Sequence, residues 1–117
     1  MPHVVLNGKV AIETIFNEIK PLFIRNEKSI LKTTDIYLER RKNAILIDSL
    51  AIDAEKRTVF LTLISERDDG VVIRLYPQID FEKTDGVKKI LVALAKQLIA
   101  TFPELKIGET NLDKYLK

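Results

Sequence analysis

Residues 44–76 show the clearest alternation of apolar and polar positions in this chain. Three apolar segments, AILIDSLAID, TVFLTLISE and VVIRLY, are rich in β-branched and aromatic residues, which favour strands. The charged sequences AEKR (54–57) and RDDG (67–70) separate them. Short turns of this composition between apolar segments are typical of antiparallel hairpins. The pattern therefore predicts three consecutive antiparallel strands.

The alternation within the second segment is incomplete, so each face of the predicted sheet carries apolar groups. Val59, Leu61 and Leu63 alternate on one side, whereas Phe60 and Ile64 point to the other. A sheet with one solvated face is expected to be more polar on that side. Each face therefore needs a cover, and the sequence leaves open whether this chain or a partner supplies it.

Two segments with helical spacing of apolar residues flank the strand region, one before it and one after it in the sequence. Residues 86–102 place apolar side chains at the i, i+3, i+4, i+7 spacing of a long helix, and Pro103 follows its last turn. Residues 10–24 show a similar period, but Pro21 interrupts it. Because proline removes a helical hydrogen bond, this helix is expected to kink there or to end near Glu18.

The order of these elements predicts the α+β class. We expect a three- or four-stranded antiparallel meander with an N-terminal helix and a long C-terminal helix. The strand number stays open because residues 34–42 fit a first strand or, with their Leu, Glu, Arg and Lys, a helix. A short turn is expected after Asn111. The length of 117 residues predicts one domain, residues 1–117.

Composition and charge narrow the classes of function. With 46% hydrophobic and 31% charged residues the chain is expected to be globular. Its 19 basic and 17 acidic residues give a net charge of +2, too small to indicate a polyanionic partner. The chain contains no cysteine, which excludes disulfides and thiolate chemistry. It shows neither a signal-peptide pattern nor an apolar segment of membrane-spanning length, so we expect a cytoplasmic protein.

The inventory of catalytic groups is small. His3 is the only histidine, and we expect a solvated or strand-edge residue rather than an oriented base. Zinc ligation is not expected without cysteines or paired histidines. Asp68, Asp69 and Gly70 fit a tight turn better than a metal site, because one turn offers too few oxygens for calcium. We therefore expect no metal, no cofactor and no catalytic residue.

Asp48 raises one alternative, because it interrupts an apolar segment. A carboxylate in a central strand must be solvated, hydrogen-bonded or shifted in pKa. A small-ligand enzyme with a site around Asp48, Arg74 and Tyr76 is therefore an alternative function. The simpler interpretation is an Asp48 side chain paired across the sheet with Arg74 or a lysine.

A second alternative is weak nucleic-acid binding through the basic residues Arg40, Arg41 and Lys42. In an up-and-down meander, the other basic turn, residues 56–57, lies at the opposite end of the sheet, roughly 30 Å away. The turn that returns to the first end carries the acidic residues 68–69. Basic charge is thus not gathered on one surface, as a phosphate backbone requires.

The function that we expect is a non-catalytic binding or assembly module that acts as a homodimer or binds another protein. If the helices cover one sheet face, the mixed apolar and polar face is left for a partner. The residues expected at this interface are Phe60, Thr62, Ile64, Val72, Arg74 and Tyr76. A Phe60→Asp, Ile64→Asp variant would then be a folded monomer. The competing arrangement is a monomer with one helix on each face.

Overall fold

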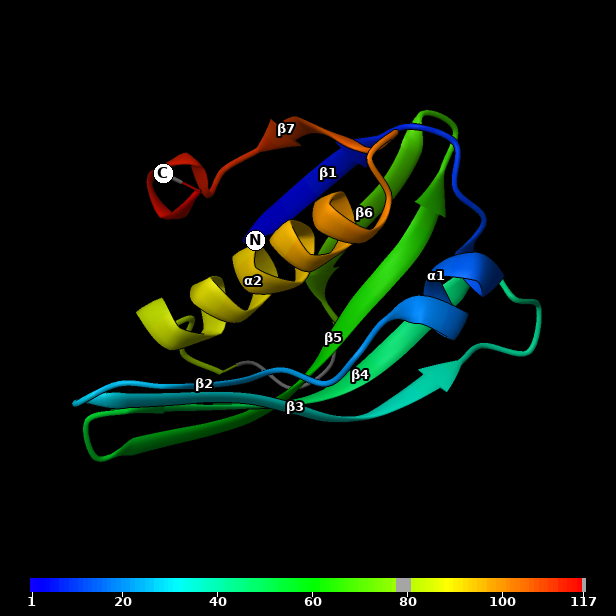
Figure 1. Cartoon of the computed structure of the whole chain (residues 1–117). Helices are drawn as coiled ribbons and strands as arrows, with labels where there is room; N and C mark the ends of the chain where they lie inside the picture. Colours follow the sequence, from blue (N-terminus) through cyan, green and yellow to red (C-terminus); the bar gives the residue numbers. More distant parts are fainter. Residues whose placement is uncertain (78–80, 117) are drawn as a thin grey trace.

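The computed structural model describes residues 1–77 and 81–116, and one antiparallel sheet dominates it. Seven strands of the described residues form this sheet in the order β2-β3-β4-β5-β6-β1-β7. The sheet curls like half a barrel around the long helix α2 (Figure 1). The strands are β1 (His3–Asn7), β2 (Phe23–Arg25), β3 (Ser29–Leu38), β4 (Ala44–Asp53), β5 (Lys56–Arg67), β6 (Gly70–Leu75) and β7 (Lys106–Thr110). The helices are α1 (Ile12–Glu18), α2 (Asp85–Thr101) and the 3₁₀ turn η1 (Asp113–Tyr115).

The predicted three- or four-stranded meander with a long C-terminal helix is wrong. The predicted strands at residues 44–76 and the helix at 86–102 are present, but β1, β2 and β7 widen the sheet. Helix α2 is not the last element, because β7 follows it and returns to pair with β1. The added strands are three to five residues long, which is too short for alternation to reveal them. Long-range pairing stabilises these strands.

The two uncertain segments of the sequence are resolved as follows. Residues 34–38 belong to strand β3, because pairing along β4 outweighs their helix propensity. Helix α1 ends at Glu18, and the chain after Pro21 enters β2 rather than a second helix. Neither helix in the described part of the chain is long and apolar enough to cross a membrane.

The β5–β6 turn determines which side chains share a face, and the predicted grouping is wrong. Arg67 pairs with Gly70 across a two-residue turn, so Leu63 lies opposite Arg74 and Ile64 lies opposite Ile73. Paired residues project to the same side of a sheet. Leu63 therefore shares a face with Arg74, not with the odd-numbered aliphatic residues of β6.

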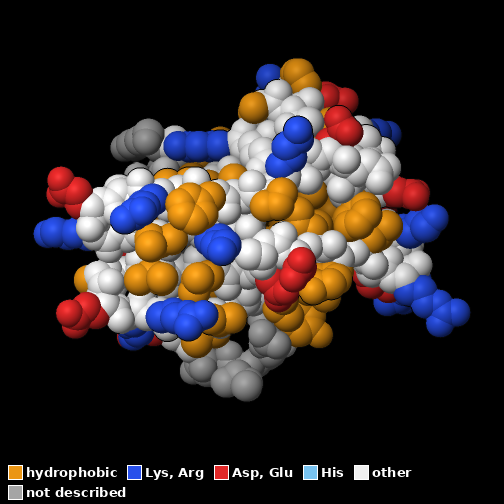
Figure 2. All heavy atoms as spheres, turned by 60° about the horizontal axis from the view of Figure 1, so that its bottom comes forward, with side chains coloured by type: hydrophobic (Ala, Val, Ile, Leu, Met, Phe, Trp, Pro, Cys, Tyr) orange, Lys and Arg blue, Asp and Glu red, His pale blue; other side chains and the backbone are white. Residues whose placement is uncertain are grey.

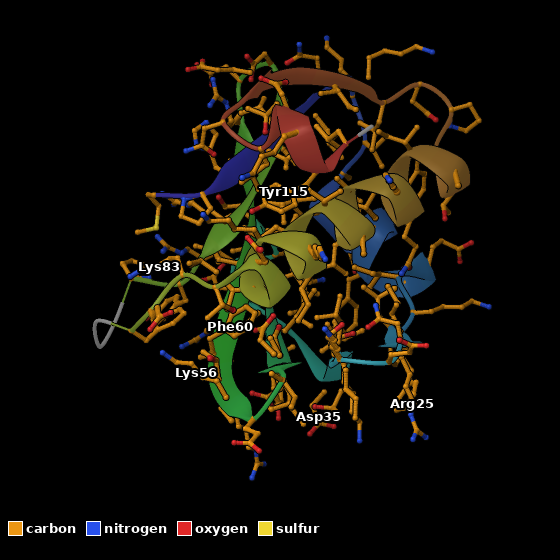
Figure 3. All side chains as sticks on the ribbon, turned by 90° about the vertical axis from the view of Figure 1, so that its left-hand side faces the viewer. Arg25, Asp35, Lys56, Phe60, Lys83 and Tyr115 are labelled. Atoms are coloured by element: carbon orange, nitrogen blue, oxygen red, sulfur yellow. The ribbon has the colours of Figure 1, made fainter. Side chains whose placement is uncertain are left out.

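The inner face of the sheet packs against the two helices. Phe60 is 2% exposed, and Ile12 of α1 and Leu94 of α2 are buried in the same apolar core. Figure 3 shows Phe60 lying between the sheet and α2. Thr62 is also buried on this face. Its hydroxyl forms a 2.8 Å hydrogen bond with the Ser49 hydroxyl, which satisfies the buried polar group. The arrangement with one helix on each face is therefore wrong.

The N-terminus of α2 is anchored to the end of β4 by Asp53. One carboxylate oxygen accepts a 2.7 Å hydrogen bond from the Thr84 hydroxyl, and the other accepts a 3.0 Å bond from the backbone N–H of Gly86. Thr84 also caps the helix by accepting from Val87 N–H. A Cβ at Gly86 would lie 2.6 Å from the Asp53 carboxylate, so glycine allows the sheet and the helix to meet here.

Gly70 allows β1 to pair closely with β6. Its φ of +154° is unfavourable for other residues, and a Cβ would lie 1.9 Å from the Leu6 carbonyl oxygen. The sequence Asp68-Asp69-Gly70 therefore serves the turn and the adjacent strand pairing. In β1, His3 is a half-buried residue of a strand that is paired on its two sides, by β6 and β7. Of the two expected positions, the strand edge is therefore wrong, whereas the side chain is partly exposed to solvent.

The face assignment predicts opposite outcomes for two adjacent substitutions. Phe60→Asp should lose at least about 4 kcal/mol of unfolding free energy, because it removes a buried ring and buries a charge. Val59→Asp should keep the fold, because Val59 is 67% exposed on the other face. Circular dichroism and urea unfolding measure the two effects. A folded Phe60→Asp protein would contradict the assignment.

A second prediction concerns the anchor of α2. Asp53→Ala should lower the unfolding free energy by about 1–2 kcal/mol, since it leaves Thr84 and Gly86 without their acceptor. Glu109→Ala, which removes an exposed carboxylate from β7, is the matched control and should change stability little. Equal effects of the two substitutions in urea unfolding would argue against an anchoring role.

Candidate functional site

A group of exposed apolar side chains lies on the outer face, which we define as the side of the sheet opposite α2. Val59 is 67% exposed, Phe23 63% and Tyr37 51%. The half-buried and exposed apolar side chains on strands β2 to β5 of the outer face are Phe23, Ile30, Tyr37, Leu46, Leu50, Ile52, Val59 and Leu61. Such an area is unusual for the surface of a monomer and marks a candidate interaction site.

Charges on the outer face are separated along the strands. Strand register places Arg25 and Arg57 in one row across the sheet, and Lys32 lies in the next row. Asp35 and Asp48 follow beyond it. Figure 2 shows this side, with Lys and Arg side chains around one hydrophobic group and acidic side chains beside another. The outer face thus has a basic end and an acidic middle.

Asp48 does not form the pair that we expected. Its carboxylate accepts a 3.3 Å hydrogen bond from the Tyr37 hydroxyl on the neighbouring strand β3. The negative charge of Asp35, followed by burial and by Asp48, raises the pKa of Tyr37 above its usual value. Tyr37 therefore stays protonated and able to donate this bond.

No hydrogen bond or ion pair joins the three residues of the enzyme alternative in the described part of the chain. Asp48 on β4 and Arg74 on β6 are separated by β5, whose Leu61 and Leu63 lie between them. Two strand spacings correspond to roughly 10 Å. Arg74 instead lines a hollow of about 370 Å³ with His3 and other residues of β1, β5 and β6. Strand β5 thus separates Asp48 from Arg74, and the backbone N–H of Tyr76 bonds to the carbonyl of Leu61 on that strand.

The six predicted interface residues divide between the two sides of the sheet. Phe60, Thr62 and Ile64 are buried on the inner face. Val72 and Arg74 lie on the outer face, and Tyr76, just after β6, is 38% exposed. The two-residue turn between β5 and β6 was the signal that could have corrected the assignment. A turn of two residues pairs odd-numbered residues of β5 with even-numbered residues of β6, so these share one face of the sheet.

The basic turn at Arg40, Arg41 and Lys42 is partly neutralised. Arg41 forms a 3.2 Å ion pair with Glu39, and Lys42 forms a 3.4 Å pair with Glu13 of α1. Arg40 is exposed. The acidic β5–β6 turn lies at the same end of the sheet, as expected, because the N–H of Glu66 bonds to the carbonyl of Asn43.

Metal-ligating side chains do not gather in the described parts of the structure. In residues 1–77 and 81–116, no group of three His, Asp or Glu side chains is placed to hold a metal ion. His3 Nδ1 lies 3.1 Å from the Met1 carbonyl oxygen. The ring thus has a backbone contact, and no second titratable side chain is shown to orient it as a base.

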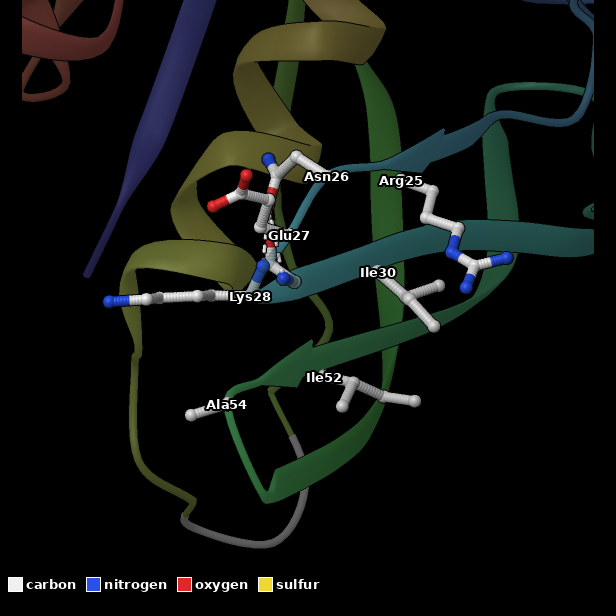
Figure 4. A pocket seen from close by; sticks show the side chains of 8 residues that line it. Arg25, Asn26, Glu27, Lys28, Ile30, Ile52 and Ala54 are labelled. Atoms are coloured by element: carbon white, nitrogen blue, oxygen red, sulfur yellow. Dashed lines mark hydrogen bonds between the residues drawn. The ribbon is translucent and has the colours of Figure 1, made fainter.

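A hollow of about 620 Å³ lies between the tips of the β2–β3 and β4–β5 hairpins. Figure 4 shows Ile30 and Ile52 side by side at its wall, with Arg25 above them. The polar group of Asn26 stabilises the β2–β3 turn, since its Oδ1 accepts hydrogen bonds from the backbone N–H and the side-chain hydroxyl of Ser29. This hollow is therefore a continuation of the outer face around the hairpin tips.

The charges around Tyr37 lead to a prediction. Asp35→Asn should lower the pKa of Tyr37, because a neighbouring carboxylate disfavours the phenolate. Tyr115 is the internal control, since its pKa is raised by its hydrogen bond to Asp85. Asp85→Asn should lower the pKa of Tyr115 and leave that of Tyr37 unchanged. NMR titration of the tyrosine ring carbons measures each value, and an unchanged Tyr37 in Asp35→Asn would contradict this interpretation.

The site that these positions support best is the outer face, because it combines exposed apolar area with an ordered arrangement of charge. Val59 and Leu50 lie near its centre, and Lys32 and Asp35 lie beside them on β3. The side chains that cover the inner face are used in the core.

No model of a known protein family, no curated protein and no solved structure matches this chain.

Proposed function

We propose that the protein is a non-catalytic assembly module that forms a homodimer through the outer face. The observation that supports this proposal best is the exposure of Val59 and Phe23, at 67% and 63%, within a group of apolar side chains on the outer face. Removing such an area from water is favourable in proportion to its size. A two-fold symmetric pair is the commonest closed arrangement of identical chains.

Basic and acidic side chains follow one another along the strands of the outer face. This order is compatible with a two-fold axis that lies in the interface and runs perpendicular to the strands. Such an axis reverses the rows of one copy relative to the other. Lys32 then faces Asp35 of the second copy, and Val59 faces Leu61 of the second copy. Lys32 of each copy comes to lie over the acidic row of the other copy, whereas the row of Arg25 and Arg57 faces the row of Tyr37 and Leu46. Complementary charge of this kind favours correct association.

The size of the molecule is compatible with such an interface. A stable dimer buries roughly 800 Å² on each partner, a patch of roughly 28 Å by 28 Å. The two longer principal extents of the molecule are 39 and 31 Å. The outer face therefore offers enough area, provided that most of β3, β4 and β5 takes part.

Two substitutions at the centre of the outer face test the dimer. Leu50→Asp, Val59→Asp should be a folded monomer, because it places charges in the apolar contact. Lys106→Asp, an exposed change on β7, is the control and should stay dimeric. Sedimentation equilibrium measures the mass, and circular dichroism confirms the fold. A wild-type chain that is monomeric at its highest soluble concentration would overturn the proposal.

Charge exchange tests the orientation of the two copies. Lys32→Asp and Asp35→Lys should each weaken the dimer, by roughly tenfold in dissociation constant, because each creates two symmetry-related repulsive contacts. The double variant restores opposite charges across the axis and should recover most of the affinity. A double variant as weak as the single ones would exclude this orientation while leaving the dimer itself in place.

A further inference from the structure

A hollow of about 400 Å³ opens between α2 and the β2–β3 hairpin on the inner side of the sheet. Its apolar lining comes from Ile24, Leu31, Val92 and Ala93. Leu31 and Val92 are almost fully buried, whereas Ile24 is 39% exposed. Small-ligand sites commonly have volumes of roughly 300–1,000 Å³ and apolar linings. This hollow has the size and the floor of such a site.

Lysine side chains surround this apolar floor. Lys89 and Lys96 of α2 and Lys114 of η1 line the hollow. Lys89, Val92, Ala93 and Lys96 follow the spacing i, i+3, i+4, i+7, which places them along one side of the helix. Seven residues of helix span about 10 Å. An apolar strip of about this length is therefore bounded by a positive charge at each end.

The charges of these lysines are not neutralised by salt bridges within the described residues. The ion pairs found there involve other side chains, and none contains Lys89, Lys96 or Lys114. Lys114 lies over the ring of Tyr115, with Nζ 5.1 Å from the ring centroid. The hollow thus keeps a positive rim that an anion could approach.

The carboxylate of Asp85 lies close to this rim and stays negatively charged, so it offsets part of the positive charge. Asp85 accepts a hydrogen bond from the Tyr115 hydroxyl, and this bond, with smaller contributions from Lys114, Lys89 and Lys88, holds the pKa of Asp85 below its usual value. Figure 3 shows Tyr115 lying against α2. Tyr115 and Lys114 also line a neighbouring hollow of about 340 Å³ that contains Lys88. The positive region therefore extends past Tyr115.

We propose that the hollow between α2 and the β2–β3 hairpin binds a small amphiphile with an anionic head group and a single apolar chain. The chain lies along Val92 and Ala93, against Ile24 and Leu31. The head group is held by lysines at the rim, whose long stems cover apolar surface while their charges stay in water. This site lies on the opposite side of the sheet from the proposed dimer contact and does not depend on it.

Decanoate is a suitable probe of this site. Titration of the methyl-labelled full chain, followed by NMR, should shift the methyl signals of Ile24, Leu31, Val92 and Ala93 to saturation. Decanol and decyltrimethylammonium, which have the same chain with a neutral or a positive head, should bind at least roughly fivefold more weakly. Decanol binding as tightly as decanoate would overturn the assignment of the lysines.

Matched variants separate the charge of the rim from the charge of the whole protein. Lys89→Ala, Lys96→Ala should weaken decanoate binding by roughly fivefold, because two exposed attractions are removed. Lys9→Ala, Lys106→Ala changes the net charge equally, lies outside the described hollows and should bind as the wild type does. Ala93→Phe should block the hollow. Equal weakening in the two double variants would overturn the proposal.

Two further outcomes would also overturn it. Decanoate that shifts the methyl groups of Leu50 and Val59 instead would indicate general binding to the outer face. Sedimentation with phosphatidylserine vesicles in the absence of saturable decanoate binding would indicate a membrane surface as the ligand. The Leu50→Asp, Val59→Asp variant should bind decanoate normally, so failure of the dimer and failure of this site are distinguishable.

Discussion

The burial of one apolar helix in the curve of a single sheet is the constraint on which most of this structure depends. Helix α2 contacts strands β1, β3, β4 and β6, so the sheet must be wide and curled to surround it. A meander of three or four strands would leave part of this helix in water. The short strand β1 therefore matters to the core, although it shows no strong pattern of its own.

The same packing leaves the outer face open. Helix α1 also lies on the inner side, where Ile12 and Ile15 are buried, and in the described residues no helix covers the opposite side. The exposed apolar groups there are a consequence of this one-sided arrangement. The proposed contact with a second copy would replace the missing layer, much as two sheets pack face to face within a sandwich.

Strand register, rather than nearness in sequence, arranges the charges of this protein. Arg25 and Arg57 are 32 positions apart in the chain but share one row of the sheet. Arg41 and Lys42 are adjacent, yet their partners come from β3–β4 and from α1. The lysines of α2 have the spacing of an ordinary solvated helix face. Their relation to an apolar floor exists only because β2 and β3 pass beneath them.

The sequence by itself determined the local elements: the strands within residues 44–76, the acidic turn before Gly70, and the α2 helix. These depend on side-chain periodicity and turn chemistry, which act over a few residues. Only the tertiary structure decided the strand number, the cover of each face and the partner of Asp48. These depend on pairing between distant segments, and a two-residue turn or a Ser49–Thr62 hydrogen bond is enough to reverse what composition suggests.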